Sequence, residues 1–176
     1  MKTLWSVDSS HSEITFKVKH MMIANLTGIM TDYSVDVETQ GDDFTTAKIS
    51  FIGKTASIST GNDQRDAHLR SEEFFDIEKY PEIKFVSTGY EKTDYANFRL
   101  MGNLTIRNIT KKISLDVQFG GIEKDPWGNT KAGFSVNGVI HRKEFDLNWN
   151  AALESGGIMV SEDVKIACEI ELIKAN

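Results

Sequence analysis

The four histidines of this chain are the first residues to test for catalytic or metal-binding chemistry. They are His11, His20, His68 and His141. A zinc site usually places two histidines, or a histidine and a cysteine, at short fixed spacing, and none of the four has such a partner. His20 stands apart because it ends an alternating segment beside Met21-Met22. The sequence therefore predicts no catalytic residues, no metal site and no cofactor.

The single cysteine, Cys168, leads to the same prediction. It lies in an alternating apolar segment, where a free thiol is usually buried and inert. One cysteine cannot form an internal disulfide, so the fold does not depend on oxidation. The chain also lacks a Gly-x-x-x-x-Gly-Lys phosphate loop and a Gly-x-Ser-x-Gly nucleophile elbow.

The densest group of polar residues runs from Ser57 to Arg70. One interpretation is a capped helix that Arg65 and Asp66 fix against the rest of the fold. The other is a cationic rim that binds a phosphate or another polar head group. The residue chemistry alone favours the structural interpretation.

Length and charge narrow the class of protein. The chain has 176 residues and a formal net charge of −6, and its composition predicts one domain over 1–176. No basic stripe suggests nucleic acid, and no run of 18 apolar residues suggests an integral membrane span. The N-terminus has no apolar segment of signal-peptide length, which predicts a cytoplasmic protein, or a periplasmic one if a leader was removed. A homodimer is left open.

Period-two alternation of apolar and polar residues must supply the elements that position these groups. Such alternation predicts strands with one dry and one wet face. The mixed segment 26–37 predicts a strand without a well-defined face. The alternating segments are 13–19, 47–51, 98–106, 112–119, 132–140 and 164–172.

One segment has helical rather than alternating spacing. Residues 62–80 mix charges with Leu69, Phe74 and Phe75, and Asn62 can cap the start while Pro81 prevents continuation. The sequence predicts a helix, or a helix followed by a turn, near 62–78.

Many antiparallel strands with one helix are typical of a closed barrel or of a sandwich. The strands reach about ten residues, or roughly 33 Å. An eight-stranded barrel of that height would enclose a narrow apolar tube suited to an extended hydrocarbon chain. A sandwich with a filled core fits the same alternation, so periodicity leaves both folds open.

A long irregular motif lies between Ser59 and Phe85. Its residues are Thr60-Gly61, Arg65-Asp66, His68-Leu69-Arg70-Ser71, Phe74-Phe75-Asp76, Tyr80-Pro81 and Ile83-Lys84-Phe85. Further matching residues are Trp5, Asp8, His11, Ser12, His20-Met21, Gly102, Leu104-Thr105-Ile106, Thr110, Arg142, Phe145 and 164–171. Together they resemble the signature of the YceI-like family of polyisoprenoid-binding proteins, over essentially the whole chain.

The resemblance implies an all-β, lipocalin-like extended antiparallel barrel of about eight strands that binds an isoprenoid lipid, such as a polyprenyl phosphate or an isoprenoid quinone, or a fatty amphiphile. The expected cavity-lining residues are Phe16, Val18, Phe85, Phe98, Leu115, Val117, Phe134, Val136, Ile166 and Ile170. The candidates for contact with a polar head group are His20, Arg65, His68 and Arg142.

Three positions depart from the family pattern. Asn108 and Asp146 stand where the family commonly has glycine, and both residue types tolerate positive φ angles better than most. These two departures are therefore compatible with the fold. His141 stands where the family often has Asp or Asn, and it predicts a changed charge at the cavity mouth.

The leading hypothesis is a lipid carrier or store without enzymatic activity. One alternative is an enzyme that acts on an isoprenoid or a quinone, with His20 or His68 as acid or base. A second alternative is a scaffold barrel with a filled core whose outer surface binds a partner.

Overall fold

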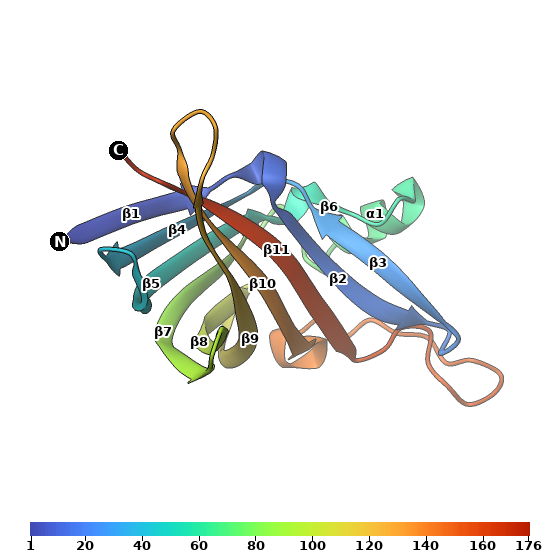
Figure 1. Cartoon of the computed structure of the whole chain (residues 1–176). Helices are drawn as coiled ribbons and strands as arrows, with labels where there is room; N and C mark the ends of the chain where they lie inside the picture. Colours follow the sequence, from blue (N-terminus) through green and yellow to red (C-terminus); the bar gives the residue numbers. More distant parts are fainter.

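The computed structural model describes all of residues 1–176 and consists mainly of antiparallel strands (Figure 1). The strands are β1 (Lys2–Val7), β2 (Glu13–His20), β3 (Ala24–Met30), β4 (Tyr33–Gln40), β5 (Asp43–Lys54), β6 (Ile58–Ser59), β7 (Glu82–Asp94), β8 (Asn97–Ile106), β9 (Ile109–Lys124), β10 (Thr130–His141) and β11 (Asp163–Lys174). The helices are α1 (Asp63–Arg70) and the short 3-10 helices η1 (Ser9–His11), η2 (Thr55–Ser57) and η3 (Arg142–Phe145). None of them combines the length and the apolar character needed to cross a bilayer.

Eight strands close into a barrel. Their order is β1-β4-β5-β7-β8-β9-β10-β11, and β1 pairs with β11 to complete the circle. In that last pairing Trp5 lies opposite Lys174, and Val7 lies opposite Leu172. The predicted antiparallel barrel of about eight strands is therefore confirmed, and the sandwich alternative is wrong.

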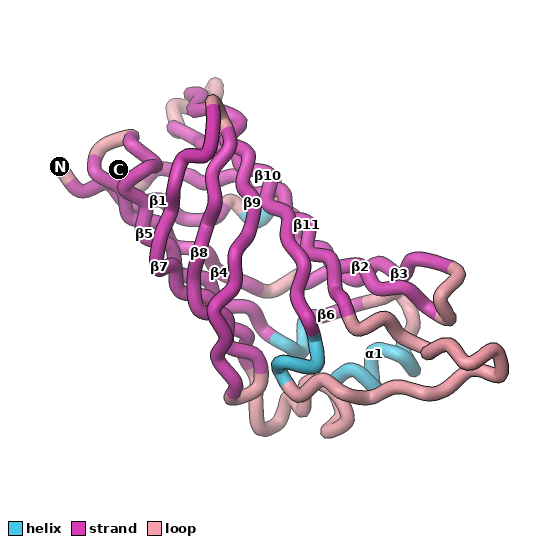
Figure 2. The backbone as a smooth tube through the Cα atoms, turned by 90° about the horizontal axis from the view of Figure 1, so that it is seen from below, coloured by secondary structure: helices cyan, strands magenta, loops and turns pink.

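The remaining strands extend one end of the barrel. β2 follows β1 along the same edge of β11, where Lys17 lies opposite Lys165. The β2–β3 hairpin then projects beyond the closed part, next to the loop that follows η3 (Figure 2). Segment 26–37 is two strands, because β3 pairs with β2 in the extension whereas β4 pairs with β1 in the barrel. This change of partner explains why the segment shows no single dry face.

The helical segment is shorter than 62–78. α1 ends at Arg70, and turns continue through the following residues as far as β7. Asn62 caps the helix as expected, since its side chain accepts a hydrogen bond from the Arg65 amide at 2.9 Å. The predicted alternative of a helix followed by a turn is the one that the structure has.

Of the two positions where the family commonly has glycine, one has a positive φ angle. Asp146 ends η3 with a φ of 61°, in the left-handed conformation that glycine adopts readily. In the β8–β9 turn, the residue with a positive φ is Arg107, at 57°, and not Asn108. The Arg107 guanidinium donates to the Phe74 carbonyl at 2.7 Å, which ties that turn to the segment after α1.

Aromatic side chains pack together at the end of the barrel near the two termini. Trp5 packs on Phe44 with ring centroids 4.9 Å apart, and its indole N–H donates to Thr39 Oγ1 at 2.9 Å. Phe134 contacts Phe44 at 5.0 Å and Phe119 at 5.1 Å. We call Trp5, Phe44, Phe119 and Phe134 the aromatic plug. It packs at the end of the barrel where β1 begins and β4 turns into β5, opposite α1 (Figure 1).

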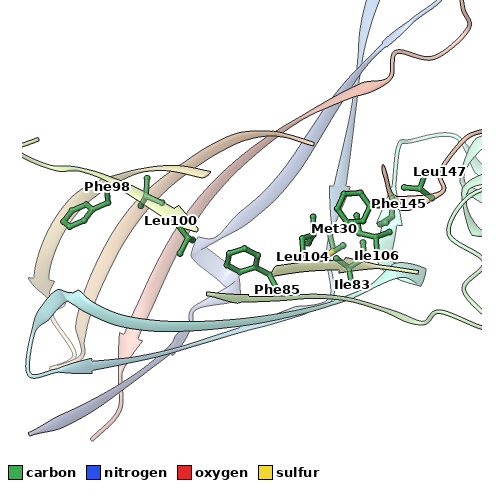
Figure 3. Packing of buried hydrophobic residues seen from close by; sticks show 11 residues of the cluster. Met30, Ile83, Phe85, Phe98, Leu100, Leu104, Ile106, Phe145 and Leu147 are labelled. Carbon is green, nitrogen blue, oxygen red and sulfur yellow. The ribbon is translucent and has the colours of Figure 1, made fainter. Parts of the chain in front are cut away.

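A second group of buried residues runs along the wall from the plug toward α1. Figure 3 shows part of it, with Phe98 at one end of the row and Phe145 and Leu147 at the other. Phe145 is fully buried and Leu147 is 5% exposed. The wall is thus packed along its length, and the space that remains is inside the barrel.

Candidate functional site

The interior of the barrel holds a cavity of about 630 Å³. This equals the share of liquid volume of about twenty water molecules. Of the 45 residues that line it, 36 are hydrophobic. A water-filled space with such walls is unfavourable, so the cavity is suited to an apolar guest.

Two glycines in the wall hold the cavity open. A Cβ atom added at Gly28 would lie 2.1 Å from the ring of Phe16, its cross-strand partner. A Cβ atom added at Gly102 would lie 2.4 Å from the ring of Phe85. The far end of each ring therefore lies close to a backbone position without a side chain, as in the pairing of aromatic residues with glycine known from other sheets. This arrangement keeps two large rings out of the centre of the tube.

Nine of the ten residues expected to line the cavity lie on its wall. They are Phe16, Val18, Phe85, Leu115, Val117, Phe134, Val136, Ile166 and Ile170. Phe98 points inward as its alternation predicts, but it does not reach the cavity. Its ring stacks on Tyr90 at 4.7 Å and approaches Phe119 of the plug at 6.4 Å. The role of the nine residues in binding stays a prediction.

The polar residues of the cavity are concentrated at one end. Nine polar residues line it, and all except Thr15 belong to the end of β2, to the segment from Thr60 through α1, or to η3. We call these eight the mouth: Lys19, His20, Thr60, Asn62, Gln64, Arg65, His68 and Arg142. No carboxylate lines the cavity, although the chain has 26 acidic residues. The mouth therefore carries hydrogen-bond donors and positive charge.

Arg65 and Asp66, which are adjacent in the sequence, do not bond each other. Both bind Thr60 instead. Asp66 accepts hydrogen bonds from the Thr60 amide at 2.9 Å and from its hydroxyl at 2.6 Å, while Arg65 donates to the Thr60 carbonyl at 2.8 Å. Burial opposes ionisation of Asp66, but the hydrogen bonds from Thr60 and Ser59 outweigh it and lower the pKa of the carboxyl. Asp66 is thus a buried anchor, and Arg65 remains partly free at the mouth.

The two predicted histidines occupy different sides of the mouth. His68, on α1, lies edge-on to Trp149 at 4.7 Å and to Phe74 at 5.0 Å, and its Nε2 bonds the carboxylate of Glu73. His20 ends β2 and forms an isolated bridge with Val160. Both lie on the cavity wall, and their contact with a ligand stays a prediction.

Arg142 has a structural task as well as a place on the wall. It is 3% exposed, and burial lowers its pKa. Its nitrogens donate to the carbonyls of Leu147 at 2.6 Å, Ser161 at 2.8 Å, Trp149 at 2.9 Å and Val160 at 3.2 Å. Most of its donors are therefore used to hold the loop between η3 and β11 over the mouth.

His141 and Cys168 differ in how they meet the cavity. His141 is exposed, bonds Asp163 through Nδ1, and is absent from the cavity wall. The expectation that it changes the charge at the mouth is therefore wrong. Cys168 lies on the wall, and burial raises the pKa of its thiol to about 12, as an inert thiol requires.

The loop after η3 contributes cavity residues that the sequence did not predict. Leu147, Trp149 and Met159 all line the cavity. A signal was present, because Phe145, Leu147 and Trp149 stand at every second position between polar residues. The segment forms no named strand, so its alternation was too short to be recognised.

A charged cluster lies outside the cavity, near η1. The Lys131 ammonium is 2.9 Å from Asp8 and 3.0 Å from Glu171, and His11 Nδ1 is 2.8 Å from Asp8. Hydrogen bonds from Lys131, Ser10 and His11 lower the pKa of Asp8. Asp8, His11 and Glu171 could gather around a cation, but the Lys131 ammonium already contacts both carboxylates.

The fold and the site together define a class of protein: lipocalin-like barrels with an apolar interior and a single polar mouth. The sequence pattern of the YceI-like domain matches residues 5–172, and the chain belongs to that family. It is 35% identical over 170 residues to a UPF0312 protein of Staphylococcus aureus (strain USA300), with 96% of each chain covered. The resemblance inferred from the motifs is thereby confirmed.

Solved structures show the same architecture. A Campylobacter jejuni YCEI protein is 33% identical, with a TM-score of 0.76 over 90% of each chain. Burkholderia cenocepacia BcnA is 18% identical, with a TM-score of 0.81 over 94% of this chain and 98% of that one. A polyisoprenoid binding domain from Saccharophagus degradans is 13% identical, with a TM-score of 0.69 over 97% and 98%. The last two similarities concern the fold.

Proposed function

We propose that this chain binds a long-chain isoprenoid amphiphile in the barrel, with the hydrocarbon chain in the tube and the head group at the mouth, for carriage or storage. The observation that carries the proposal is the unequal distribution of polarity along one cavity. Its deep part is apolar, while eight of its nine polar residues lie together at the α1 end. A molecule with one long apolar chain and one polar end has the same distribution.

The isoprenoid class is supported by the family and by one structural neighbour, which is described as a polyisoprenoid binding domain. The aromatic plug is consistent with a single entrance, because it leaves the chain end of a ligand against Phe44 and Phe134. A guest of this kind would also stabilise the folded protein, since it binds only the folded state.

The charge of the mouth supports an anionic or strongly accepting head group. Lys19 and Arg65 are cationic, Gln64 and Asn62 can donate, and no carboxylate lines the cavity. Guanidinium and ammonium groups bind phosphate oxygens through charge-assisted hydrogen bonds. Among isoprenoids of equal length we therefore expect the polyprenyl phosphate to bind most tightly, then the quinone, then the uncharged polyprenol.

Native mass spectrometry of delipidated protein mixed with each of these three lipids tests the proposal. The expected result is a one-to-one adduct with the phosphate and a higher melting temperature. Recovery of the lipid unchanged would distinguish carriage from turnover. Failure of all three lipids to form an adduct or to raise the melting temperature would contradict the proposal.

Two neighbouring positions on β9 give a matched pair of variants. Val117 faces the cavity and is 4% exposed, whereas Gln118 faces outward. Val117→Arg would place a charge in the tube and should abolish the adduct, while Gln118→Arg should bind lipid like the parent. A circular dichroism spectrum of each variant identifies a loss of binding that is due to unfolding.

A further inference from the structure

Three apolar side chains stand exposed at the tip of the β2–β3 hairpin. Met21, Met22 and Ile23 are 40%, 52% and 81% exposed. Figures 1 and 2 show this hairpin projecting beyond the closed part of the barrel. We call these three residues the apolar tip. Neighbouring exposed apolar side chains of this kind often mark a contact surface.

The backbone of the tip is also unfavourable for the residues that it carries. Met21 has a φ of 53° and Met22 a φ of 64°, both in the left-handed region. Hairpin turns that need positive φ angles strongly prefer Asn, Asp and Gly. Two methionines at these positions neither stabilise the turn nor make the surface more polar. A local conflict between sequence and structure is typical of a functional position.

The tip is continuous with the mouth of the cavity. The Met21 amide donates to the Met159 carbonyl at 2.7 Å, and Met159 lines the cavity. Met22 lies against Gly157 of the same loop, with its Cγ 3.3 Å from the position of an added Cβ. The residue before the tip, His20, belongs to the mouth itself. A surface that contacts the tip therefore lies at the entrance to the cavity.

Exposed lysines lie on the outer face next to the tip. Lys17 on β2 and Lys165 on β11 lie directly opposite each other, and neither forms an ion pair. Like charges in this arrangement destabilise a sheet. The next residue on the same face of β11, Asp163, is bonded to His141. In a chain with a net charge of −6, two cations therefore lie side by side without an ion-pair partner.

From these observations we infer that the apolar tip and the neighbouring lysines dock the protein on an anionic lipid bilayer, with the mouth facing the membrane. The inference rests on the proposed function, because it gives a lipid ligand a route into the cavity that avoids water. The methionine and isoleucine side chains enter the interface of the bilayer, and Lys17 and Lys165 bind its anionic head groups. This combination of apolar insertion and basic residues is typical of interfacial attachment.

Sedimentation with lipid vesicles tests the inference. Full-length protein is mixed with vesicles of phosphatidylcholine alone, or with an equal mixture of phosphatidylcholine and phosphatidylglycerol, neither containing an isoprenoid. The protein is expected to sediment with the mixed vesicles, and to do so less in high salt, because salt screens the lysines.

Three double variants separate the contribution of the apolar tip to vesicle binding from that of the lysines. Met22→Ser with Ile23→Ser should weaken binding to the mixed vesicles about tenfold, since both lose apolar area. Lys17→Gln with Lys165→Gln should remove the preference for anionic vesicles and the effect of salt. The control, Tyr95→Ser with Trp127→Ser, removes two side chains that are 93% and 83% exposed in hairpins at the plug end, and should leave binding unchanged.

Several results would overturn the inference. They are a parent protein that does not sediment, a tip variant that sediments like the parent, and a control variant that loses as much binding as the tip variant. Light scattering without vesicles tests the alternative that the apolar tip is a dimer interface. A dimer that Ile23→Ser dissociates would also overturn the inference. Native mass spectrometry of the tip variant with polyprenyl phosphate keeps the two proposals distinct. A tip variant that still binds the lipid but no longer sediments with vesicles supports docking. A parent protein that sediments with vesicles but binds no lipid contradicts only the proposed function.

Discussion

The two ends of the barrel are built on opposite principles. At the plug end, four aromatic rings contact one another at centroid distances between 4.9 and 5.5 Å. At the mouth, an eight-residue helix and a loop without regular strands cover the opening, and the polar residues of the cavity gather there. The comparison indicates that stability is concentrated at one end and binding at the other. Each variant below tests whether this separation holds.

Removal of a plug ring should have the largest effect on stability. Phe44 is 4% exposed and contacts Trp5, Phe119 and Phe134. Phe44→Ala should lower the free energy of unfolding by about 3–5 kcal/mol, because it leaves a cavity among packed rings. Chemical denaturation measures the loss, and Tyr95→Ala in an exposed turn at the same end is the control. If Phe44→Ala abolished lipid binding but left stability intact, the main role of Phe44 would be contact with the ligand, and the separation would fail.

The loop over the mouth should depend on one guanidinium. Arg142→Met removes the donors for four backbone carbonyls, and we expect a loss of about 2–3 kcal/mol, because buried carbonyls remain without partners. Proteolysis of residues 146–161 should become faster at the same time. Arg142→Lys keeps the charge without the planar geometry and should recover only part of the protection. Unchanged proteolysis in Arg142→Met would show that other contacts hold the loop.

Asp66 should contribute less than Arg142 to the free energy of unfolding, and its contribution should depend on pH. Its pKa is lowered in the folded protein, so the ionised carboxyl stabilises the fold above the unfolded-state pKa of about 3.9. This contribution is lost as the pH falls through the folded-state pKa. Asp66→Asn should therefore cost about 1–2 kcal/mol at pH 7, and the difference from the parent should narrow in acid.

Urea denaturation of the two proteins at neutral and acidic pH measures that difference. Asp63→Asn, which changes an exposed carboxylate on the same helix, is the matched control. A difference that stays constant from neutral to strongly acidic pH would mean that the charge of Asp66 does not matter. The stability lost in Asp66→Asn would then come from hydrogen bonds that do not require a charge.

The Cys168 thiol should report ligand binding through its rate of alkylation, because it lies on the cavity wall. Burial raises its pKa from 9.0 to about 12, which leaves about a thousandfold less thiolate at neutral pH. Alkylation by iodoacetamide, followed by mass spectrometry, should therefore be slow in the native protein, and slower still with lipid bound. Equal rates with and without lipid would place the ligand away from this part of the wall.

The alternation of side chains predicts most of the wall but little of the two ends. Strands such as β9 and β11 are evident in the sequence because burial on one face forces a period of two. Phe98 was assigned to the cavity because alternation reports which face a residue is on, not which side chains pack over it. Its cross-strand partner Val117 lines the cavity, whereas the ring of Phe98 stacks on Tyr90 and lies near Phe119.

The contacts of the mouth were harder to predict because they join segments that are distant in sequence or irregular. Arg142 holds a loop through backbone carbonyls, which no side-chain pattern encodes. The adjacent Arg65 and Asp66 suggested an ion pair, whereas both residues turn to Thr60. The motif identified these positions correctly as belonging together, and only the geometry revealed which atoms meet.

The close fit of Phe16 over Gly28 has a consequence for how such barrels diversify. Because an added Cβ would lie 2.1 Å from the ring, a single methyl group at this position has to displace the ring. A single substitution therefore changes the width of the cavity, with no change in strand number or hydrogen-bond register. In proteins of this fold, one substitution can thus also change the thickness of the ligand that fits, while the surrounding strands stay the same.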